Sequence, residues 1–204
     1  MISAEPLRQS AIQPFAVNRG LCRANKGYTI MLVRSCLVVA AALLLSTAAF
    51  AQGGPKPTDP QIAHIAYTAG VIDINAAKQA LQKTKNKEVK DFAEGMVRDH
   101  EAVNNQALAL VKKLNVTPED NDTSRALTKQ ASEKLAELKG LNGAAYDKAY
   151  IANEVAYHKT VNNALQKTLI PSATNSELKS LLETGLKIFE GHQQHAEQVA
   201  AALK

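Results

Sequence analysis

Residues 87–115 read KEVKDFAEGMVRDHEAVNNQALALVKKLN, and their apolar side chains recur at intervals of four and three residues with a single gap. The apolar positions are Val89, Ala93, Met96, Val103, Ala107, Leu110 and Leu114. These intervals place the side chains on one stripe of an α-helix, as in the seam of a helical bundle. Asn86 precedes the segment as a helix-capping residue. The segment therefore predicts a long amphipathic helix.

Four further segments have the same helical periodicity, and no run of β-branched residues with a period of two competes with them. The predicted helix ends are marked by Asp59 as an N-cap before Pro60, by Gly140, by Pro171, and by Thr174 and Glu177, which have the spacing of a capping box. We expect an all-α four-helix bundle whose second and third long helices are joined by a crossover carrying a short extra helix. The predicted helices are 60–83, 87–115, 124–139 (the short one), 144–169 and 176–203, within one domain at 60–204.

The first 51 residues are predicted to be a leader that the mature protein lacks. Residues 31–51 have the charged start, apolar middle and small-residue end (Ala49-Phe50-Ala51) of a signal peptide. Residues 1–30 have no periodicity and are interpreted as an over-long start upstream of Met31. Residues 52–59, rich in glycine and proline, are expected to be a flexible tether.

Removal of this leader changes the charge and the cysteine content of the chain. The formal charge falls from +5 to +1, because five of the 24 basic residues and one of the 19 acidic residues precede residue 52. The apparent basicity is then no argument for nucleic-acid binding. Both cysteines, Cys22 and Cys36, also precede residue 52, which excludes disulfides and thiolate ligands from the mature domain.

Polar residues interrupt all four apolar stripes near the middle of each long helix. In the second helix the interruption is His100, and in the last it is His192. Mid-helix positions of an antiparallel bundle share one level, so these side chains are expected to converge. The full set of candidates is Asp73, His100, Glu154, His158 and His192.

Such a layer is either a structural hydrogen-bonded network or a site for one transition metal. Imidazoles with one or two carboxylates suit zinc, copper, nickel or iron. A di-iron centre is disfavoured, because no Glu-x-x-His pair is present in the bundle. His64 falls on another face and is interpreted as a packing or surface residue.

The mature sequence shows no catalytic or cofactor-binding motif. It lacks a glycine-rich phosphate loop, a G-x-S-x-G elbow and an H-E-x-x-H helix, so no catalytic residue is assigned. No transmembrane span is expected after residue 51. Oligomeric state and protein partners stay open.

Three segments resemble domain-of-unknown-function family 4142, a family of exported bacterial helical proteins often labelled outer-membrane or periplasmic. They are Met96-Val97-Arg98-Asp99-His100 with Asn104, Tyr146 to Ile151 leading to His158, and His192 with Ala196. The resemblance covers about residues 60–203 and implies a ferritin-like fold, a location in the cell envelope and recurring histidines at 100, 158 and 192. His195 is additional, and Asp73 stands where the family tends to have glutamate.

Two functions follow as hypotheses. The first is a non-enzymatic periplasmic protein that binds a metal or an envelope partner. The alternative is a metal-dependent oxidoreductase that uses the same histidine layer. An enzyme needs an open coordination position and a substrate route, whereas the alanine-rich seams bring the helices close together. This closeness favours the non-enzymatic hypothesis.

Overall fold

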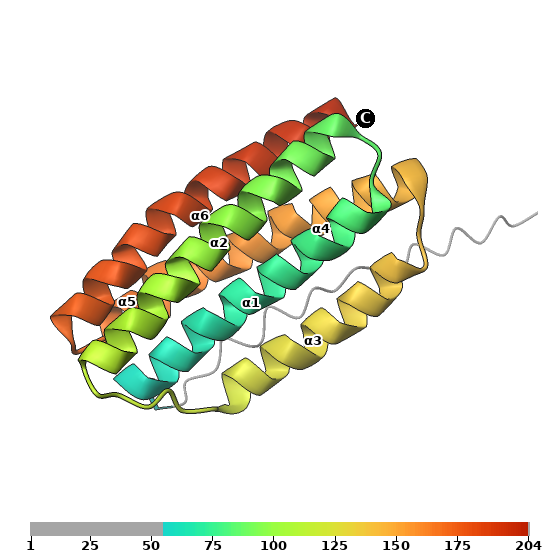
Figure 1. Ribbon diagram of the computed structural model, residues 1–204. Coiled ribbons are helices and arrows are strands. Elements are labelled where there is room, and N and C mark those ends of the chain that lie inside the picture. The colour runs from blue at the N-terminus through green and yellow to red at the C-terminus, as the bar shows by residue number, and fades with distance from the viewer. Residues whose placement is uncertain (1–54, 204) are drawn as a thin grey trace, which may run out of the picture. The chain divides into compact units, whose positions relative to one another are not determined.

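Helices form all of the regular structure in residues 55–203, the part of the chain that the computed structural model describes (Figure 1). The all-α prediction is therefore confirmed for these residues. The predicted leader, 1–51, lies outside them. The helices are α1 (Asp59–Lys83), α2 (Lys87–Lys113), α3 (Asp122–Lys139), α4 (Gly143–Ala164), α5 (Ile170–Ser172) and α6 (Ser176–Ala202), with a π-helical turn η2 (Leu165–Leu169) between α4 and α5.

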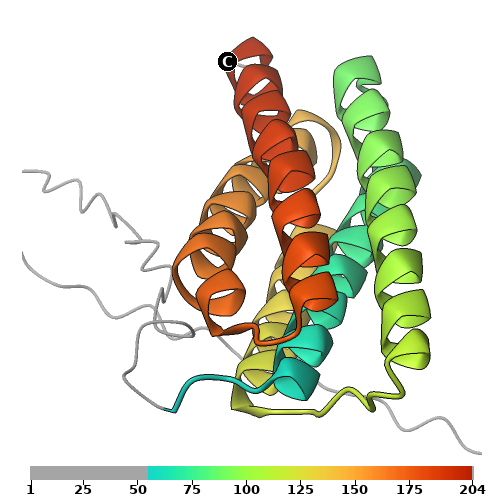
Figure 2. The ribbon, with the colours of Figure 1, turned by 90° about the vertical axis from the view of Figure 1, so that its left-hand side faces the viewer.

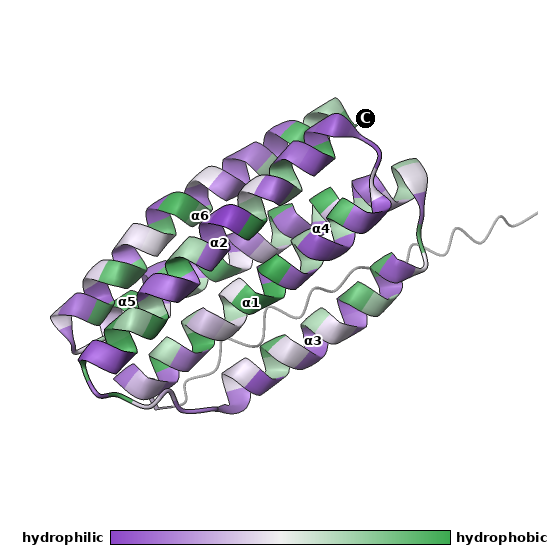
Figure 3. Ribbon diagram, viewed as in Figure 1, coloured by the Kyte–Doolittle hydropathy of each residue, from purple (hydrophilic) through white to green (hydrophobic). Residues whose placement is uncertain are grey.

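The four long helices form two antiparallel pairs that pack side by side. α1 pairs with α2, and α4 pairs with α6, while α2 also packs on α6 and α1 on α4. Helix α3 is shorter than α1 and lies along it on the outer side of this group, as Figures 1 and 2 show. Hydrophobic and hydrophilic residues are interspersed along every helix (Figure 3), as amphipathic packing requires.

The buried apolar residues fall into two clusters along the length of the helices. One joins the end of α1 and the start of α2 to Tyr146, Tyr150 and Val199. The other joins the start of α1 to the end of α4, η2 and the start of α6, including Ile62 and Leu182. The polar mid-helix residues lie between these clusters in sequence on every long helix. The core is thus apolar at both ends and polar in its middle.

Most of the predicted helix ends agree with the structure to within two residues. Asn86 caps α2 by accepting hydrogen bonds from the backbone N–H groups of Glu88 and Val89, as expected. Gly140 ends α3. Helix α2 ends two residues before the predicted limit, because Asn115 adopts a left-handed conformation with φ of 52°.

The expectation that the third long helix ends before Pro171 is wrong. Helical structure continues through η2 and α5 to Ser172. In η2 the N–H of Ile170 donates to the carbonyl of Leu165, five residues earlier. A proline lacks the N–H donor and its ring clashes with the preceding turn of an α-helix. The wider π turn accommodates the proline, which spacing rules do not anticipate.

The expected capping roles of Asp59 and Thr174 are also wrong. The N-cap of α1 is Thr58, and the N-cap of α6 is Asn175. The Asp59 carboxylate instead accepts hydrogen bonds from Thr174 N (2.8 Å), Thr174 Oγ1 (2.6 Å) and Asn175 N (2.8 Å). This carboxylate therefore joins the start of α1 to the start of α6.

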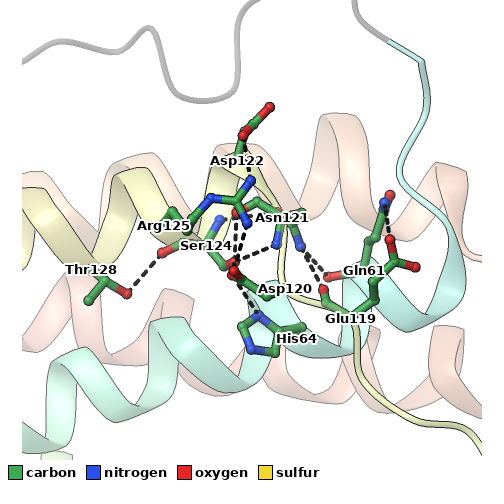
Figure 4. A network of polar contacts seen from close by, with 9 residues as sticks. All are labelled: Gln61, His64, Glu119, Asp120, Asn121, Asp122, Ser124, Arg125 and Thr128. Carbon is green, nitrogen blue, oxygen red and sulfur yellow. Dashed lines mark hydrogen bonds and ion pairs between the residues drawn. The ribbon is translucent and has the colours of Figure 1, made fainter.

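A polar cluster holds the segment that leads from α2 to α3 against α1. Ser124 Oγ donates to Asp120 Oδ1 (2.6 Å), and Arg125 pairs with Asp120 and Asp122 (Figure 4). Gln61 of α1 donates to Glu119 Oε1 at 3.2 Å. These contacts fix where α3 begins relative to α1.

None of the described helices is both long enough and apolar enough to cross a membrane.

Candidate metal centre

The five residues predicted to converge lie together in the middle of the helix bundle. Asp73 comes from α1, His100 from α2, Glu154 and His158 from α4, and His192 from α6. Their exposed fractions range from 1% to 9%. Their proximity agrees with the prediction from spacing, because each lies near the midpoint of a helix that spans the bundle.

Three imidazoles form the centre of this layer. The ring centroids are 5.9 Å apart for His100 and His158, 5.2 Å for His100 and His192, and 5.6 Å for His158 and His192. One ring nitrogen of each lies within 4.8 Å of one ring nitrogen of the other two. Three nitrogen donors from three helices thus lie close together.

Two buried carboxyl groups adjoin the imidazoles. One oxygen of Asp73, one oxygen of Glu154 and one ring nitrogen of His158 also lie within 4.8 Å of one another. Asp73 Oδ2 is 3.5 Å from His100 Nε2, and Glu154 Oε2 is 3.7 Å from His158 Nδ1. Two groups of three potential ligands therefore meet at His158.

Several polar atoms of the layer have no hydrogen-bond partner among residues 55–203, although they are fully buried. They are both ring nitrogens of His100, Nε2 of His158, Nδ1 of His192 and both carboxylate oxygens of Glu154. The other nitrogens of His158 and His192 are paired: Nδ1 of His158 with the Glu154 carbonyl (2.9 Å) and Nε2 of His192 with Asp99 Oδ2 (3.0 Å). Unpaired buried polar groups are costly and call for a specific explanation.

Burial sets the protonation of the three imidazoles. It lowers the pKa of His158 to about 4, and His192 adds to this effect while the hydrogen bond to the Glu154 carbonyl opposes it. It lowers the pKa of His100 well below the usual range, and His158 and His192 lower it further. It also lowers the pKa of His192, against the opposing effect of Asp99. The imidazoles are neutral at pH 7, which is the form that binds metals.

Burial has the opposite effect on the carboxyl groups. It raises the pKa of Asp73 well above its usual range, and the neighbouring Glu154 raises it further. It also raises the pKa of Glu154. Their neighbours His100 (3.5 Å from Asp73) and His158 (3.7 Å from Glu154) are neutral imidazoles, so a proton on one of the carboxyl groups is the simplest way to hold both in the core.

Aromatic and small residues close the layer on the side of the second apolar cluster. The ring of Phe189 stacks on His100 with centroids 4.6 Å apart and planes at 4°. Asn104 lies against Gly70, where a Cβ atom would be 2.4 Å from the Asn104 Oδ1. Beyond Phe189 and Asn104 lies a cavity of about 50 Å³ lined almost entirely by apolar side chains. No ligand candidate lines it.

Asp99 and Phe189 are the contacts that sequence reasoning missed. Asp99 lies on the face of α2 next to the apolar stripe and meets His192 of α6, so the stripe alone does not reveal it. The sequence contained one signal for Asp99, which is that it belongs to the segment Met96 to His100 on which the family resemblance rests. His64 lies outside the layer, 3.9 Å from Asp120 (Figure 4), and His195 is exposed and packs on Phe92.

Comparisons with known proteins address the family and the fold. A family model described as "Domain of unknown function (DUF4142)" matches residues 44–199, which confirms the resemblance found in the sequence. No curated protein matches the chain. A solved structure titled "CopM in the Cu(II)-bound form" aligns with a TM-score of 0.57 and 14% identity, covering 74% of this chain and 100% of that one. At this identity the likeness concerns the fold alone.

Proposed function

The chain belongs to the DUF4142 family, and from this premise we propose that it is a non-enzymatic protein that binds one divalent transition metal. The ligands are His100, His158 and His192, with Asp73 and Glu154 available as oxygen donors. One observation carries this proposal. Each of the three imidazoles has a buried ring nitrogen without a hydrogen-bond partner, and one ring nitrogen of each lies within 4.8 Å of one ring nitrogen of the other two.

The unpaired nitrogens favour a metal over a purely structural network. In a structural network each neutral imidazole would donate through one nitrogen and accept through the other. His100 does neither among residues 55–203. Leaving one buried polar group unsatisfied costs about 1–3 kcal/mol, so four such nitrogens are hard to explain by structure alone. A bound cation would satisfy one nitrogen of each imidazole.

The spacing of the three nitrogens suits a small cation after a modest contraction. Metal–nitrogen bonds of about 2.0–2.1 Å in a tetrahedral site bring the nitrogens about 3.4 Å apart. The nitrogens lie within 4.8 Å of one another, so a bound metal would draw them together by at most about 1.4 Å. Small rotations of the imidazole rings can supply such a shift.

Copper(II) is the metal we propose, with zinc, nickel and iron as the competitors. Imidazole ligands suit all four, and the affinity of a nitrogen site rises through the divalent series to copper(II). Residues 55–203 contain no cysteine, so the thiolates that select copper(I) are missing from this part of the chain. A solved structure of similar fold is titled as Cu(II)-bound, which is compatible with this choice.

The closed layer favours binding over catalysis. A metal-dependent oxidoreductase, the alternative hypothesis, requires an open coordination position and a route for its substrate. The five candidate ligands are at most 9% exposed, and the adjoining cavity is small and apolar. Storage or transfer of the metal demands neither feature.

We also propose the finer fold and the location. The pairs α1–α2 and α4–α6, with the segment carrying α3 running back along their length, support a ferritin-like four-helix bundle with a crossover. The signal peptide at residues 31–51 supports export to the periplasm, where an envelope partner could receive the metal. The formal charge of +1 for residues 52–204 gives no reason to propose that the protein binds nucleic acid.

Elemental analysis tests the metal proposal. The protein is produced from the full chain, recovered from the periplasm without an affinity tag or chelator, and assayed for copper, zinc, nickel and iron. We expect one equivalent of copper, lost in His158→Leu and retained in the control His195→Leu, whose side chain is exposed. No uptake, even after equilibration with all four metals, would reduce the layer to a structural network.

Mass spectrometry of the same preparation tests export. We expect a mature chain that begins at Gln52. A chain that retains residues 31–51 would contradict cleavage of the signal peptide.

A further inference from the structure

One hydrogen bond lies where the histidine layer approaches the surface. His192 Nε2 and Asp99 Oδ2 are 3.0 Å apart. The side chain of His192 is 11% exposed and that of Asp99 is 29% exposed, whereas the side chains of His100 and His158 are 2% and 1% exposed. Asp99 therefore touches the layer from outside and is not itself one of its buried members.

The chemistry of this hydrogen bond determines which nitrogen of His192 carries the proton. The carboxylate of Asp99 can only accept, so Nε2 of His192 donates. A neutral imidazole has one N–H, and the remaining nitrogen, Nδ1, therefore presents a lone pair. Nδ1 is buried and has no partner among the described residues. The lone pair of this buried nitrogen is thus available to a ligand.

Arg98 orients the Asp99 carboxylate through two contacts. Its Nε is 2.7 Å from Asp99 Oδ1, and its Nη2 is 3.1 Å from Asp99 Oδ2. These two contacts hold the carboxylate in place as the acceptor for His192.

A comparable arrangement holds the second imidazole. Nδ1 of His158 donates to the carbonyl of Glu154 at 2.9 Å, because a carbonyl oxygen can only accept. This leaves the lone pair on Nε2, which is also buried and unpartnered. Histidines that bind metals commonly donate their other N–H to a carboxylate or a carbonyl, which fixes the tautomer and the ring orientation.

We infer that Asp99 is a positioning residue of the metal centre, which holds the proton of His192 on Nε2 and so presents Nδ1 to a metal shared with His100 and His158. This inference rests on the proposed function. It assigns to the carboxylate a task that a surface ion pair does not have. It also predicts that loss of Asp99 weakens metal binding without unfolding the protein.

The experiment compares Asp99→Leu, Asp99→Asn and Asp99→Glu with the unaltered protein, each produced from the full chain. The control is Asp91→Leu, which removes an exposed carboxylate of α2 that pairs with Lys87. Copper(II) affinity is measured by competition with a chelator of known affinity. Nitrogen-15 NMR of the metal-free protein identifies the protonated ring nitrogen of His192.

We expect Asp99→Leu to weaken copper(II) binding by about 10- to 100-fold. Asp99→Asn should have a smaller effect because its amide oxygen can still accept, and Asp99→Glu should restore most of the affinity. In the metal-free protein, Nε2 of His192 should carry the proton, and Asp99→Leu should shift part of the population to Nδ1. Asp91→Leu should change neither measurement.

Two results would overturn the inference in distinguishable ways. Unchanged affinity in Asp99→Leu, together with a large loss in His192→Leu, would remove the role of Asp99 and leave the proposed function intact. Absence of copper uptake by the unaltered protein would refute the proposed function and this inference with it. Circular dichroism of each metal-free variant separates both results from a failure to fold, and Asp99→Asn provides a variant of nearly unchanged size.

Discussion

Nδ1 of His158 donates to the main-chain oxygen of Glu154, one turn earlier on α4, at 2.9 Å, while the Glu154 carboxylate lies farther away at 3.7 Å. The orientation of this imidazole is therefore fixed by the backbone of its own helix. The Glu154 carboxylate is left free for another task. The two residues can thus be altered separately, which makes the layer accessible to mutational analysis.

His100→Leu is expected to abolish metal uptake while preserving the helical content. The leucine removes both unpaired ring nitrogens but keeps an apolar contact with Phe189, so the melting temperature should change by only a few degrees. Elemental analysis and circular dichroism measure the two quantities. Retention of a full equivalent of metal would show that His100 is not a ligand.

The metal-free protein is expected to be most stable between about pH 6 and pH 7. Burial lowers the pKa of the three histidines below 6.5, and that of His158 to about 4. Their contribution to the free energy of unfolding is therefore complete above pH 6.5 and is lost as the pH falls toward 4. For His158 alone the full loss is about 3 kcal/mol. Urea denaturation with a chelator present, from pH 4.5 to 8.5, measures the profile.

Glu154 acts in the opposite direction on the alkaline side of this maximum. Burial raises the pKa of Glu154 from 4.5 to about 8. Its contribution to the free energy of unfolding is therefore present at low pH and is lost as the pH rises through 8. In Glu154→Gln the decline in stability above pH 6.5 should become shallower. A profile that stays the same in this variant would argue against a protonated Glu154.

Gly70→Ala is expected to destabilise the protein by about 1–3 kcal/mol. The new Cβ would lie 2.4 Å from Asn104 Oδ1, so Asn104 must move within a packed core. Gly191→Ala is the matched control, since its Cβ would meet nothing within 4 Å, and it should gain roughly 0.5–1 kcal/mol. Thermal denaturation compares them. Addition of Asn104→Ala to Gly70→Ala should recover part of the loss if the contact is responsible.

Asp59→Ala is expected to lower the free energy of unfolding by about 1–2 kcal/mol. It removes the acceptor of three hydrogen bonds from Thr174 and Asn175. Asp91→Ala, which breaks an exposed pair with Lys87, should cost less than about 0.5 kcal/mol. Equal effects in urea denaturation would show that Asp59 contributes no more than an ordinary surface charge.

The helices could be predicted from the sequence because each long segment carries an apolar stripe and a recognisable start. Asn86 and Gly140 act locally, so their roles follow from neighbouring residues. The errors at Thr174 and Pro171 have different causes. Asp59 reaches Thr174 from 115 positions away, and a π turn accommodates the proline. Neither effect can be read from spacing.

The candidate site was predictable in its members and unpredictable in its surroundings. Mid-helix positions meet at one level in any antiparallel bundle, which brought His100, His158 and His192 together. The partner of His192 depends on how α6 is rotated against α2, and no single-helix pattern contains that rotation. Metal binding by these residues stays a prediction.

The origin of the five side chains bears on how long a metal would stay bound. Asp73 and His100 belong to the α1–α2 pair, whereas Glu154, His158 and His192 belong to α4 and α6. Neither pair holds all three imidazoles, so a cation would bind only after the pairs have docked. We expect a bound cation to slow unfolding and to leave the folding rate almost unchanged. The residence time of the metal would then depend on how often the α1–α2 and α4–α6 hairpins separate. A protein that receives the metal could promote this opening.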